Sequence, residues 1–354
     1  MMSEHNQNIA HVGRRPVVSV TDLGIETCGH DPHVQLVDGV SFDVFAGEMV
    51  GLVGESGSGK SLTGSALAGL LPDGVRQNAG TITIGGQVVD TSATACPDGV
   101  SVIFQNPMTS LNPSMRIGDQ IAEAVRIRHR GISRGDAKRR AVEILDRVEM
   151  NRPAERAKQY PFEFSGGMRQ RAMIGIAIAR EPQVLIADEP TTALDVTVQK
   201  SVMDLIDRLR TEMGLAALLI SHDLGVVSER SDRMMVMYAG QLVDTGPTEA
   251  MLGDPLHPYL EGLLRCIPER AMELGGLQPL PGSVLALAEA GPGCRFAPRC
   301  ALRIPECEAQ PIPLRPMADG RQVRCIRRDG TLPDDLNARI PVAAQANFGG
   351  GNDD

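Results

Sequence analysis

The sequence predicts an α/β fold built around a parallel sheet, and three observations support this prediction. Short apolar runs that suit buried strands alternate with longer runs of helical periodicity, as in strand–helix–strand units with parallel strands. A glycine-rich loop stands between one such strand and one such helix, which is typical of folds that bind phosphate at the carboxyl edge of a sheet. With 354 residues, 42% of them hydrophobic, the chain is long enough for one large domain and a smaller one.

The expected elements follow from local patterns in chain order. Strands are expected at residues 17–23, 40–44, 49–53, 81–84, 87–89, 100–104, 184–187, 216–220 and 233–238. Helices are expected at residues 61–71, 117–150, 168–180 and 196–210. Gly85 and Gly86 form the turn of a predicted hairpin, and Ser133 with Asp136 matches a capping box. A helical insert therefore separates Gln105 from the second half of the sheet.

Composition bounds the class of protein. The net charge of −9 argues against a nucleic-acid partner. No apolar run approaches the roughly 18 residues of a membrane helix, and the polar N-terminus lacks the apolar centre of a signal peptide. We therefore expect a cytosolic chain that reaches a membrane only through partners. Its seven cysteines are then not expected to form disulfides, because the cytosol is reducing.

The glycine-rich loop carries the first functional signal. Its residues are Gly54, Glu55, Ser56, Gly57, Ser58, Gly59, Lys60 and Ser61. They match G-x-x-x-x-G-K-[ST], the phosphate-binding loop of nucleoside triphosphatases. The glycines let backbone N–H groups curl around an anion, and the helix that follows adds partial positive charge. Lys60 is expected to reach the β- and γ-phosphates of ATP, and the Ser61 hydroxyl to ligate Mg²⁺.

Two carboxylates end the strand expected at residues 184–187. Asp188 and Glu189 follow it directly, and the carboxyl end of a parallel strand lies beside the phosphates in folds of this kind. Asp188 suits a role in holding Mg²⁺, directly or through water. Glu189 suits the general base that polarises the attacking water.

A second loop that could bind an anion opens the helix expected at residues 168–180. Ser165, Gly166 and Gly167 precede it, and the N–H groups of a helix N-terminus bind anions. One chain holds one γ-phosphate, which Lys60 already contacts. The simplest interpretation is that this helix faces the ATP bound by a second subunit.

Taken together, these residues resemble those of the ABC transporter ATPases. Six motifs stand in the family's order: residues 54–61, Gln105, the signature segment (residues 164–168), residues 184–189, residues 193–195 and His222. The resemblance implies that His222 contacts the γ-phosphate and that Gln105 contacts the Mg²⁺ or the attacking water. It also implies that Ser165, Gly166 and Gly167 act on the nucleotide of the opposite subunit, with Asp195 at the dimer seam.

The match narrows to the importers of oligopeptides, dipeptides and nickel. Residues 105–113, 160–163, 257–259 and 293–300 resemble segments of that subfamily, including its C-terminal extension. The resemblance implies an ATPase core with an antiparallel β subdomain, a helical insert and a small Cys-rich extension. It further implies a second ATPase subunit, identical or not, two membrane-spanning permease subunits, an external solute-binding protein and a place on the cytoplasmic face of the inner membrane.

Four cysteines gather in this extension. Cys294, Cys300, Cys307 and Cys325 lie in a Pro-rich segment, and four thiolates in a cytosolic protein suggest a metal. Zinc sites usually show C-x-x-C pairs, which are missing here. Four Cys can also hold a [4Fe–4S] cluster, for which spacing is less regular. The resemblance favours the iron–sulfur cluster, and zinc or metal-free packing are the alternatives.

Two departures from the family pattern stand out. The signature segment begins with Phe164 in place of Leu, at a position expected to be packing. No Tyr or Phe lies near Thr27, where the family usually stacks the adenine. Nucleotide affinity is then weaker, or another side chain serves in this place.

The expected organisation is a disordered tail (1–15), an ABC ATPase domain (16–265, with a helical subdomain at about 106–180), a Cys-rich extension (266–330) and a flexible tail (331–354). The expected function is ATP hydrolysis coupled to uptake of peptides or a related small solute. One alternative is a soluble ABC ATPase of DNA repair or translation. Such proteins carry two cassettes, long coiled coils or zinc modules, none of which the sequence shows. A small-molecule kinase is a weaker alternative, because it leaves Ser165 and His222 without a role.

Overall fold

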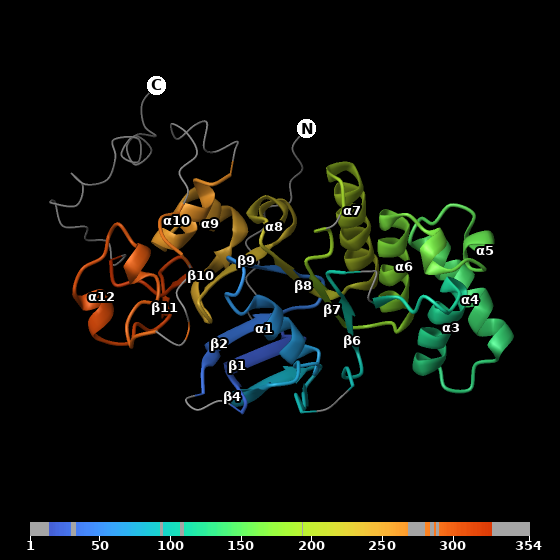
Figure 1. Ribbon diagram of the computed structural model, residues 1–354, viewed down its shortest axis with the longest axis horizontal. Helices are drawn as coiled ribbons and strands as arrows, with labels where there is room; N and C mark the ends of the chain where they lie inside the picture. Colours follow the sequence, from blue (N-terminus) through green and yellow to red (C-terminus); the bar gives the residue numbers. More distant parts are fainter. Residues whose placement is uncertain are drawn as a thin grey trace, which may run out of the picture.

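The computed structural model describes residues 14–29, 33–92, 95–106, 110–192, 194–267, 280–283, 287 and 290–327. The tails expected at residues 1–15 and 331–354 therefore lie outside the described residues, apart from residues 14 and 15. The described part contains two β-sheets, a group of helices at one end and a small C-terminal extension at the other (Figure 1). Within it, no helix combines the length and the apolar character needed to span a bilayer.

The larger sheet contains the parallel strands that the sequence predicts. Its order is β11-β12-β10-β9-β3-β8-β7-β6. The parallel strands are β3 (Met49–Val53), β6 (Val100–Ile103), β7 (Val184–Asp188), β8 (Ala216–Ser221) and β9 (Arg233–Tyr238). β10 (Gln241–Pro247) runs antiparallel to β9. The carboxyl ends of the parallel strands meet at one edge, which places the segments after β3, β6, β7 and β8 side by side.

The smaller sheet is antiparallel, in the order β2-β1-β4-β5. Its strands are β1 (Val18–Thr27), β2 (Gln35–Val44), β4 (Val75–Ile84) and β5 (Gln87–Val88). Ile84 pairs with Gln87 across the Gly85-Gly86 turn, which confirms the predicted hairpin. β1, β2 and β4 extend beyond the predicted ranges, because apolar residues such as Ile25 and Val37 stand singly or in pairs among polar residues and glycines there and form no continuous apolar run.

Helices cover the larger sheet and form the insert. The insert contains α3 (Ile117–Arg128), α4 (Arg134–Arg147), α5 (Pro153–Arg156), the 3-10 turn η1 (Pro161–Glu163) and α6 (Gly166–Ala179). Outside the insert and the C-terminal extension, the described helices are α1 (Lys60–Leu67), α7 (Val196–Met213), α8 (Leu224–Arg230), α9 (Thr248–Gly253) and α10 (Pro258–Leu264). The helix predicted at 117–150 is two helices, because the chain turns at Gly131 with a φ of +98°. The predicted cap is present, since Ser133 Oγ accepts from the Asp136 N–H at 3.1 Å.

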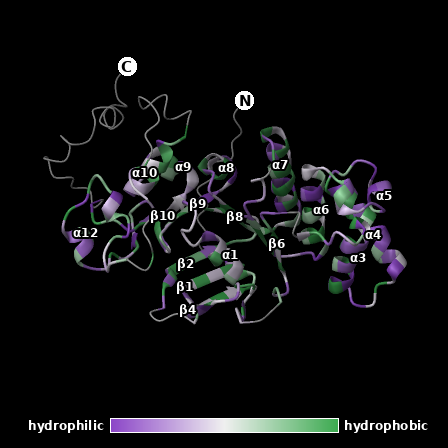
Figure 2. Cartoon of the chain, in the orientation of Figure 1, coloured by the Kyte–Doolittle hydropathy of each residue, from purple (hydrophilic) through white to green (hydrophobic). Residues whose placement is uncertain are grey.

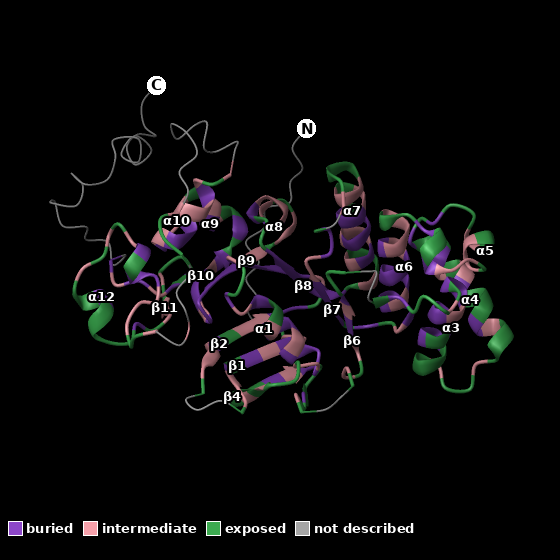
Figure 3. Ribbon diagram, in the orientation of Figure 1, coloured by how far each residue is buried: buried purple, intermediate pink, exposed green. Residues whose placement is uncertain are grey.

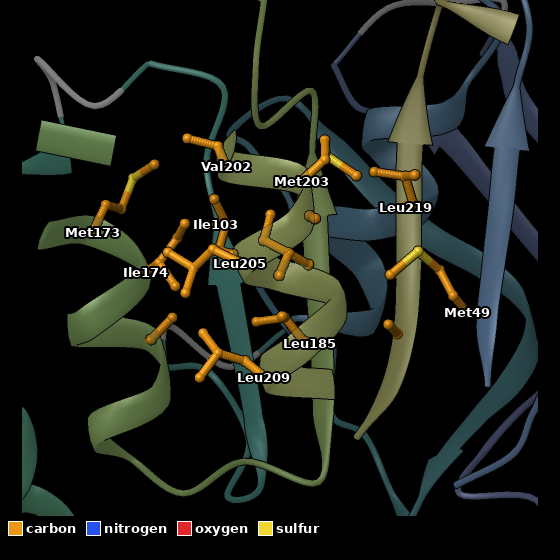
Figure 4. Close-up of a cluster of buried hydrophobic side chains, with 14 of the residues drawn as sticks. Met49, Ile103, Met173, Ile174, Leu185, Val202, Met203, Leu205, Leu209 and Leu219 are labelled. Carbon is orange, nitrogen blue, oxygen red and sulfur yellow. The ribbon is translucent and has the colours of Figure 1, made fainter. Parts of the chain in front are cut away.

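The core lies on both faces of the larger sheet. Successive residues of a strand point to opposite faces, so Met49 joins one buried cluster while Val50 joins the other. Side chains of α6 and α7, such as Ile174 and Leu205, pack towards Leu185 of β7 (Figure 4). The outer helices α4 and α5 are more hydrophilic (Figure 2) and largely exposed, whereas the strands of the larger sheet are buried (Figure 3). This rigid sheet fixes the loops at its carboxyl edge.

The Cys-rich extension joins the larger sheet. It contains η3 (Ala297–Arg299), α12 (Glu306–Ala309), β11 (Arg315–Pro316) and β12 (Gln322–Val323). β12 pairs with β10 through Asp244 with Val323 and Thr245 with Gln322. The sequence does not predict this pairing, because two-residue strands show no periodicity. The extension is therefore held against the core by backbone hydrogen bonds.

Candidate nucleotide-binding and hydrolysis site

The phosphate-binding loop (residues 54–61) connects buried β3 to α1, and its backbone requires glycine. Gly57 and Gly59 have φ values of +78° and +103°, which side chains disfavour. A Cβ at Gly54 would lie 2.1 Å from the Met237 carbonyl oxygen, so this position also has no room for a side chain. The loop therefore presents backbone N–H groups at the start of a helix, as phosphate binding requires.

Lys60 lies inside this loop. The residue is 5% exposed, and its ammonium group donates to the carbonyl oxygens of Gly54 at 2.7 Å and Glu55 at 2.9 Å. Burial lowers the pKa of Lys60, and the nearby carboxylates of Glu189 and Asp188 oppose this effect. A buried ammonium group that rests on carbonyl oxygens is well placed to exchange them for phosphate oxygens.

Ser61 and Asp188 form an oxygen pair beside Lys60. Ser61 Oγ donates to Asp188 Oδ1 at 3.1 Å, which joins the first turn of α1 to the end of β7. Burial raises the pKa of Asp188, while the Ser61 hydrogen bond and the Lys60 charge act in the other direction. A hydroxyl and a carboxylate are hard oxygen ligands, and Mg²⁺ is usually held by one or two of these together with substrate phosphates. These two residues therefore fit a magnesium ion that arrives with a nucleotide.

The carboxylate of Glu189 contacts three side chains. Its Oε2 accepts from Gln105 Nε2 at 2.8 Å and from Thr192 Oγ1 at 2.9 Å, and its Oε1 lies 3.0 Å from His222 Nδ1. Gln105 follows β6, and His222 follows β8, so the edge of the sheet brings both to the end of β7. The Glu189 backbone has a φ of +47°, an uncommon conformation for a residue other than glycine.

These contacts keep Glu189 ionised. Burial by itself raises the pKa of this carboxyl group, but the hydrogen bonds from His222 and Thr192 and the charge of Lys60 outweigh burial and lower the pKa. The side chain is thus an oriented carboxylate that can accept a proton from water. The sequence does not single out Thr192, although a hydroxyl three residues after a carboxylate at a strand end is a usable signal.

The signature segment lies away from this site in the folded chain. Ser165 and Gly166 are exposed, and Ser165 Oγ accepts from the Met168 N–H at 3.4 Å as the cap of α6. In Figure 1, β6 and β7 separate α6 from α1. The predicted packing role of Phe164 is confirmed, because its side chain is 3% exposed.

The residues that precede α7 lie next to the signature segment. Asp195 caps α7, because its Oδ1 accepts from the Val198 N–H at 3.0 Å. A Cβ at Gly167 would lie 2.7 Å from Val198 Cγ1, so the starts of α6 and α7 pack closely. The structure thus brings Lys60, Ser61, Asp188 and Glu189 together with Gln105 and His222. Ser165, Gly166 and Asp195 form a separate exposed group, with half-buried Gly167 beside them.

An imidazole ring, in place of the family's usual Tyr or Phe ring, lies near Thr27. The exposed His33 lies beside Thr27, with His33 Nδ1 3.0 Å from the Thr27 carbonyl oxygen. An imidazole therefore stands at the place where the sequence lacks Tyr or Phe. Sequence reasoning missed it because the two residues are six positions apart.

The four cysteines do not form a metal site in this structure. Burial, together with a smaller effect of the neighbouring cysteines, raises the pKa of Cys294 to about 11 and that of Cys300 to about 12. Among the described residues, no three His, Cys, Asp or Glu side chains are grouped so that they could hold a metal ion. The expected [4Fe–4S] cluster and its zinc alternative are therefore without support here.

Comparison with known proteins gives two family matches. The ABC transporter profile matches residues 37–192, and the profile of the oligopeptide/dipeptide transporter C-terminal region matches residues 243–307. A putative peptide import ATP-binding protein of Brucella abortus is 45% identical over 315 residues, which is 88% of this chain and 94% of the relative. The oligopeptide transport ATP-binding protein AppD of Bacillus subtilis is 46% identical over 302 residues, or 82% and 90% of the two chains.

Solved structures show the same fold. A dimeric ATP-binding cassette in a post-hydrolysis state with ADP and Pi aligns with a TM-score of 0.57 and 23% identity, covering 65% of this chain and 98% of the other. The protein cbiO1 of Clostridium perfringens aligns with a TM-score of 0.59 and 21% identity, covering 73% and 97%. Because the loop geometry is that of a phosphate-binding loop and the match to the relatives covers most of the chain, the chain belongs to the ATP-hydrolysing ABC transporter family.

Proposed function

We propose that this chain is the ATP-hydrolysing subunit of an importer that takes up dipeptides or oligopeptides. One observation carries the hydrolysis in this proposal: Gln105, Thr192 and His222 orient Glu189 within the electrostatic reach of Lys60. Peptide as the solute is supported by the names of the relatives and by the match of the C-terminal region to oligopeptide and dipeptide transporters.

The residues divide the work of hydrolysis. The loop N–H groups and Lys60 bind the phosphates and neutralise charge that develops on the γ-phosphoryl group. Glu189 accepts the proton of the attacking water, and Gln105 and His222 hold that carboxylate in place. Ser61 and Asp188 would hold Mg²⁺, which when bound supplies further charge neutralisation at the phosphates.

The second half of each site comes from another ATPase subunit. Ser165 and Gly166 lie at an exposed helix start with half-buried Gly167 beside them, next to Asp195. Helix N–H groups on such a surface would meet the γ-phosphate bound by the partner. In this proposal ATP closes the pair of subunits, and hydrolysis releases them.

The remaining partners follow from the role in import. Two membrane-spanning permease subunits would hold the ATPases at the cytoplasmic face of the inner membrane, and an external binding protein would deliver the solute. The helical insert, which begins after Gln105, would carry motion from the nucleotide to the permease. A metal at Cys294, Cys300, Cys307 and Cys325 stays a prediction from the four thiols in one segment and from the family resemblance, and iron and zinc analysis of anaerobically purified protein would test it.

The experiment is solute-stimulated turnover by the whole transporter. The complete importer is reconstituted in proteoliposomes with its binding protein, and labelled peptide uptake is measured with and without ATP. We expect peptide to stimulate ATP hydrolysis and to accumulate, with both lost in a Lys60→Ala variant. Stimulation by DNA or RNA, or by another solute but by no peptide, would contradict the proposal.

A further inference from the structure

The carboxylate of Glu55 points away from the loop it belongs to and into the C-terminal extension. Both of its oxygens accept hydrogen bonds from the guanidinium of Arg299, at 2.6 Å and 3.0 Å. The two residues are 244 positions apart, and Arg299 ends η3 in the Cys-rich extension. A two-pronged arginine–carboxylate contact fixes orientation as well as distance. The extension therefore touches the phosphate-binding loop directly.

Arg299 is held rigidly at its own end. Its side chain is 5% exposed, and its Nε donates to the Pro281 carbonyl oxygen at 2.8 Å. Its guanidinium lies 5.7 Å from the ring centre of Tyr238 and 5.9 Å from that of Phe296. The hydrogen bonds to Glu55 raise the pKa of Arg299 above its usual value, so the group stays charged. A buried charge of this kind needs its carboxylate partner.

The backbone of Glu55 is fixed at the same point. Its N–H donates to the Tyr259 hydroxyl at 2.8 Å, and its carbonyl oxygen accepts from Lys60 Nζ at 2.9 Å. Tyr259 packs edge-on against Tyr238 with ring centres 4.7 Å apart. Glu55 thus joins the aromatic group beneath Arg299 to the lysine that would bind phosphate.

A second arginine of the extension supports the other side of the loop. Arg295 donates to the Ala239 carbonyl oxygen at 2.5 Å and to Asp38 Oδ2 at 2.5 Å. The neighbouring Gly240 N–H donates to the Ser58 carbonyl oxygen at 2.9 Å. Arg295 therefore fixes the turn that supports Ser58, while Arg299 fixes Glu55.

We propose that residues 294–300 act as a strap that holds the phosphate-binding loop in its nucleotide-binding shape, with Arg299 as the main positioning residue. The loop contains several left-handed glycines, whose ordering costs conformational entropy. A strap that meets this cost before ATP arrives increases affinity for the nucleotide, as preorganisation does in general. This inference rests on the proposed nucleotide site.

The test compares arginine variants in the assembled transporter. Arg299→Gln should raise the KM for ATP by about tenfold and leave kcat within about twofold, because the loop loses order while Glu189 is untouched. Arg299→Lys should recover part of the loss. Arg303→Gln is the matched control, since Arg303 lies in the same extension but pairs with exposed Glu308 at 3.0 Å, and it should change neither constant.

A double variant separates positioning from general damage. Glu55→Gln alone should raise the KM for ATP by a similar factor. The double variant, Glu55→Gln with Arg299→Gln, should have a KM no higher than either single variant, because each change removes the same Glu55–Arg299 interaction. The strap proposal would be overturned if the two changes had additive effects on KM, or if Arg299→Gln lost thermal stability with an unchanged KM. If Lys60→Ala still binds a fluorescent ATP analogue, the proposed nucleotide site itself fails, whatever Arg299 does.

Discussion

The phosphate-binding loop and the signature segment are both glycine-containing starts of helices, yet their surroundings differ. The loop is partly enclosed: Ser58 and Lys60 are buried although Ser56 and Gly57 are exposed, and contacts reach the loop from β7, the β9–β10 turn and the C-terminal extension. The start of α6 is open, with Ser165 and Gly166 exposed and the Ser165 hydroxyl capping its own helix.

This difference indicates what one chain can do alone. The enclosed loop has the groups needed to bind phosphates and a metal, and a carboxylate oriented for hydrolysis. The open segment is a helix start whose Ser165 and Gly166 are exposed. We infer that binding is a property of the single chain, whereas turnover needs a second ATPase subunit to cover the exposed group.

The largest effect on nucleotide affinity is expected from Lys60→Ala. Removing the ammonium group leaves the phosphates without their buried positive partner, so nucleotide affinity should fall by about a hundredfold. Titration of the isolated chain with a fluorescent ATP analogue measures this change. Lys200→Ala, on the exposed surface of α7, is the control and should bind normally. Equal affinity in the Lys60→Ala variant would remove the distinction between the two segments.

Glu189→Gln should separate binding from chemistry. The amide keeps the shape of the side chain but cannot accept the proton of water, so ATP turnover by the transporter should fall by about 10²–10⁴-fold. Nucleotide affinity should change by less than about threefold. Glu229→Gln, at an exposed glutamate of α8, is the matched control. Near-normal phosphate release from the Glu189→Gln transporter would show that another group is the base.

Ser165→Arg tests the open segment. A long cation at the helix start would prevent a partner's nucleotide from approaching, and we expect turnover of the transporter to fall by at least tenfold. ATP binding to the isolated chain should be unchanged, since no part of the enclosed loop is touched. Equilibrium binding and steady-state hydrolysis are measured on the same preparation. A weaker affinity in the isolated chain would mean that the two segments are not independent.

The smallest effect concerns the join between the core and the extension. Asp244 of β10 is fully buried and accepts from the backbone N–H of His257 at 2.8 Å. Burial raises its pKa from 3.8 to about 6, so the folded chain holds this proton more tightly than the unfolded chain. The stabilisation is complete below about pH 4 and is lost as the pH rises through 6.

Asp244→Asn should remove this dependence. Between pH 7 and pH 4.5 the free energy of unfolding of the natural chain should rise by about 2 kcal/mol relative to the variant. Urea unfolding of both proteins across this range measures the difference, in which other titrating groups cancel. Identical pH dependence in the two proteins would contradict the assignment. Nucleotide binding near pH 7 should be equal in both.

Local spacing made much of the molecule predictable. The parallel strands, the hairpin at Gly85-Gly86 and the Ser133 cap depend on neighbouring residues, and all are present. The carboxyl edge of a parallel sheet also predicts that Asp188, Glu189 and Lys60 approach one another.

Contacts between distant segments could not be predicted in this way. Glu55 and Arg299 are 244 positions apart, and neither shows in its own segment that it has the other as a partner. The pairing of β12 with β10 involves two residues, which is too short for a periodic signal. For the four cysteines, spacing alone does not fix how the thiols are oriented after folding.

The most direct test of the central claim is hydrogen–deuterium exchange with and without ATP and Mg²⁺, using the Glu189→Gln variant. In the isolated chain, ATP should protect residues 54–61 and leave residues 165–168 unchanged. In the assembled transporter, ATP should protect both segments, because the partner's nucleotide then covers the start of α6. Protection of residues 165–168 in an isolated chain that stays monomeric with ATP, or its absence in the ATP-bound transporter, would contradict the claim that each site is shared between two subunits.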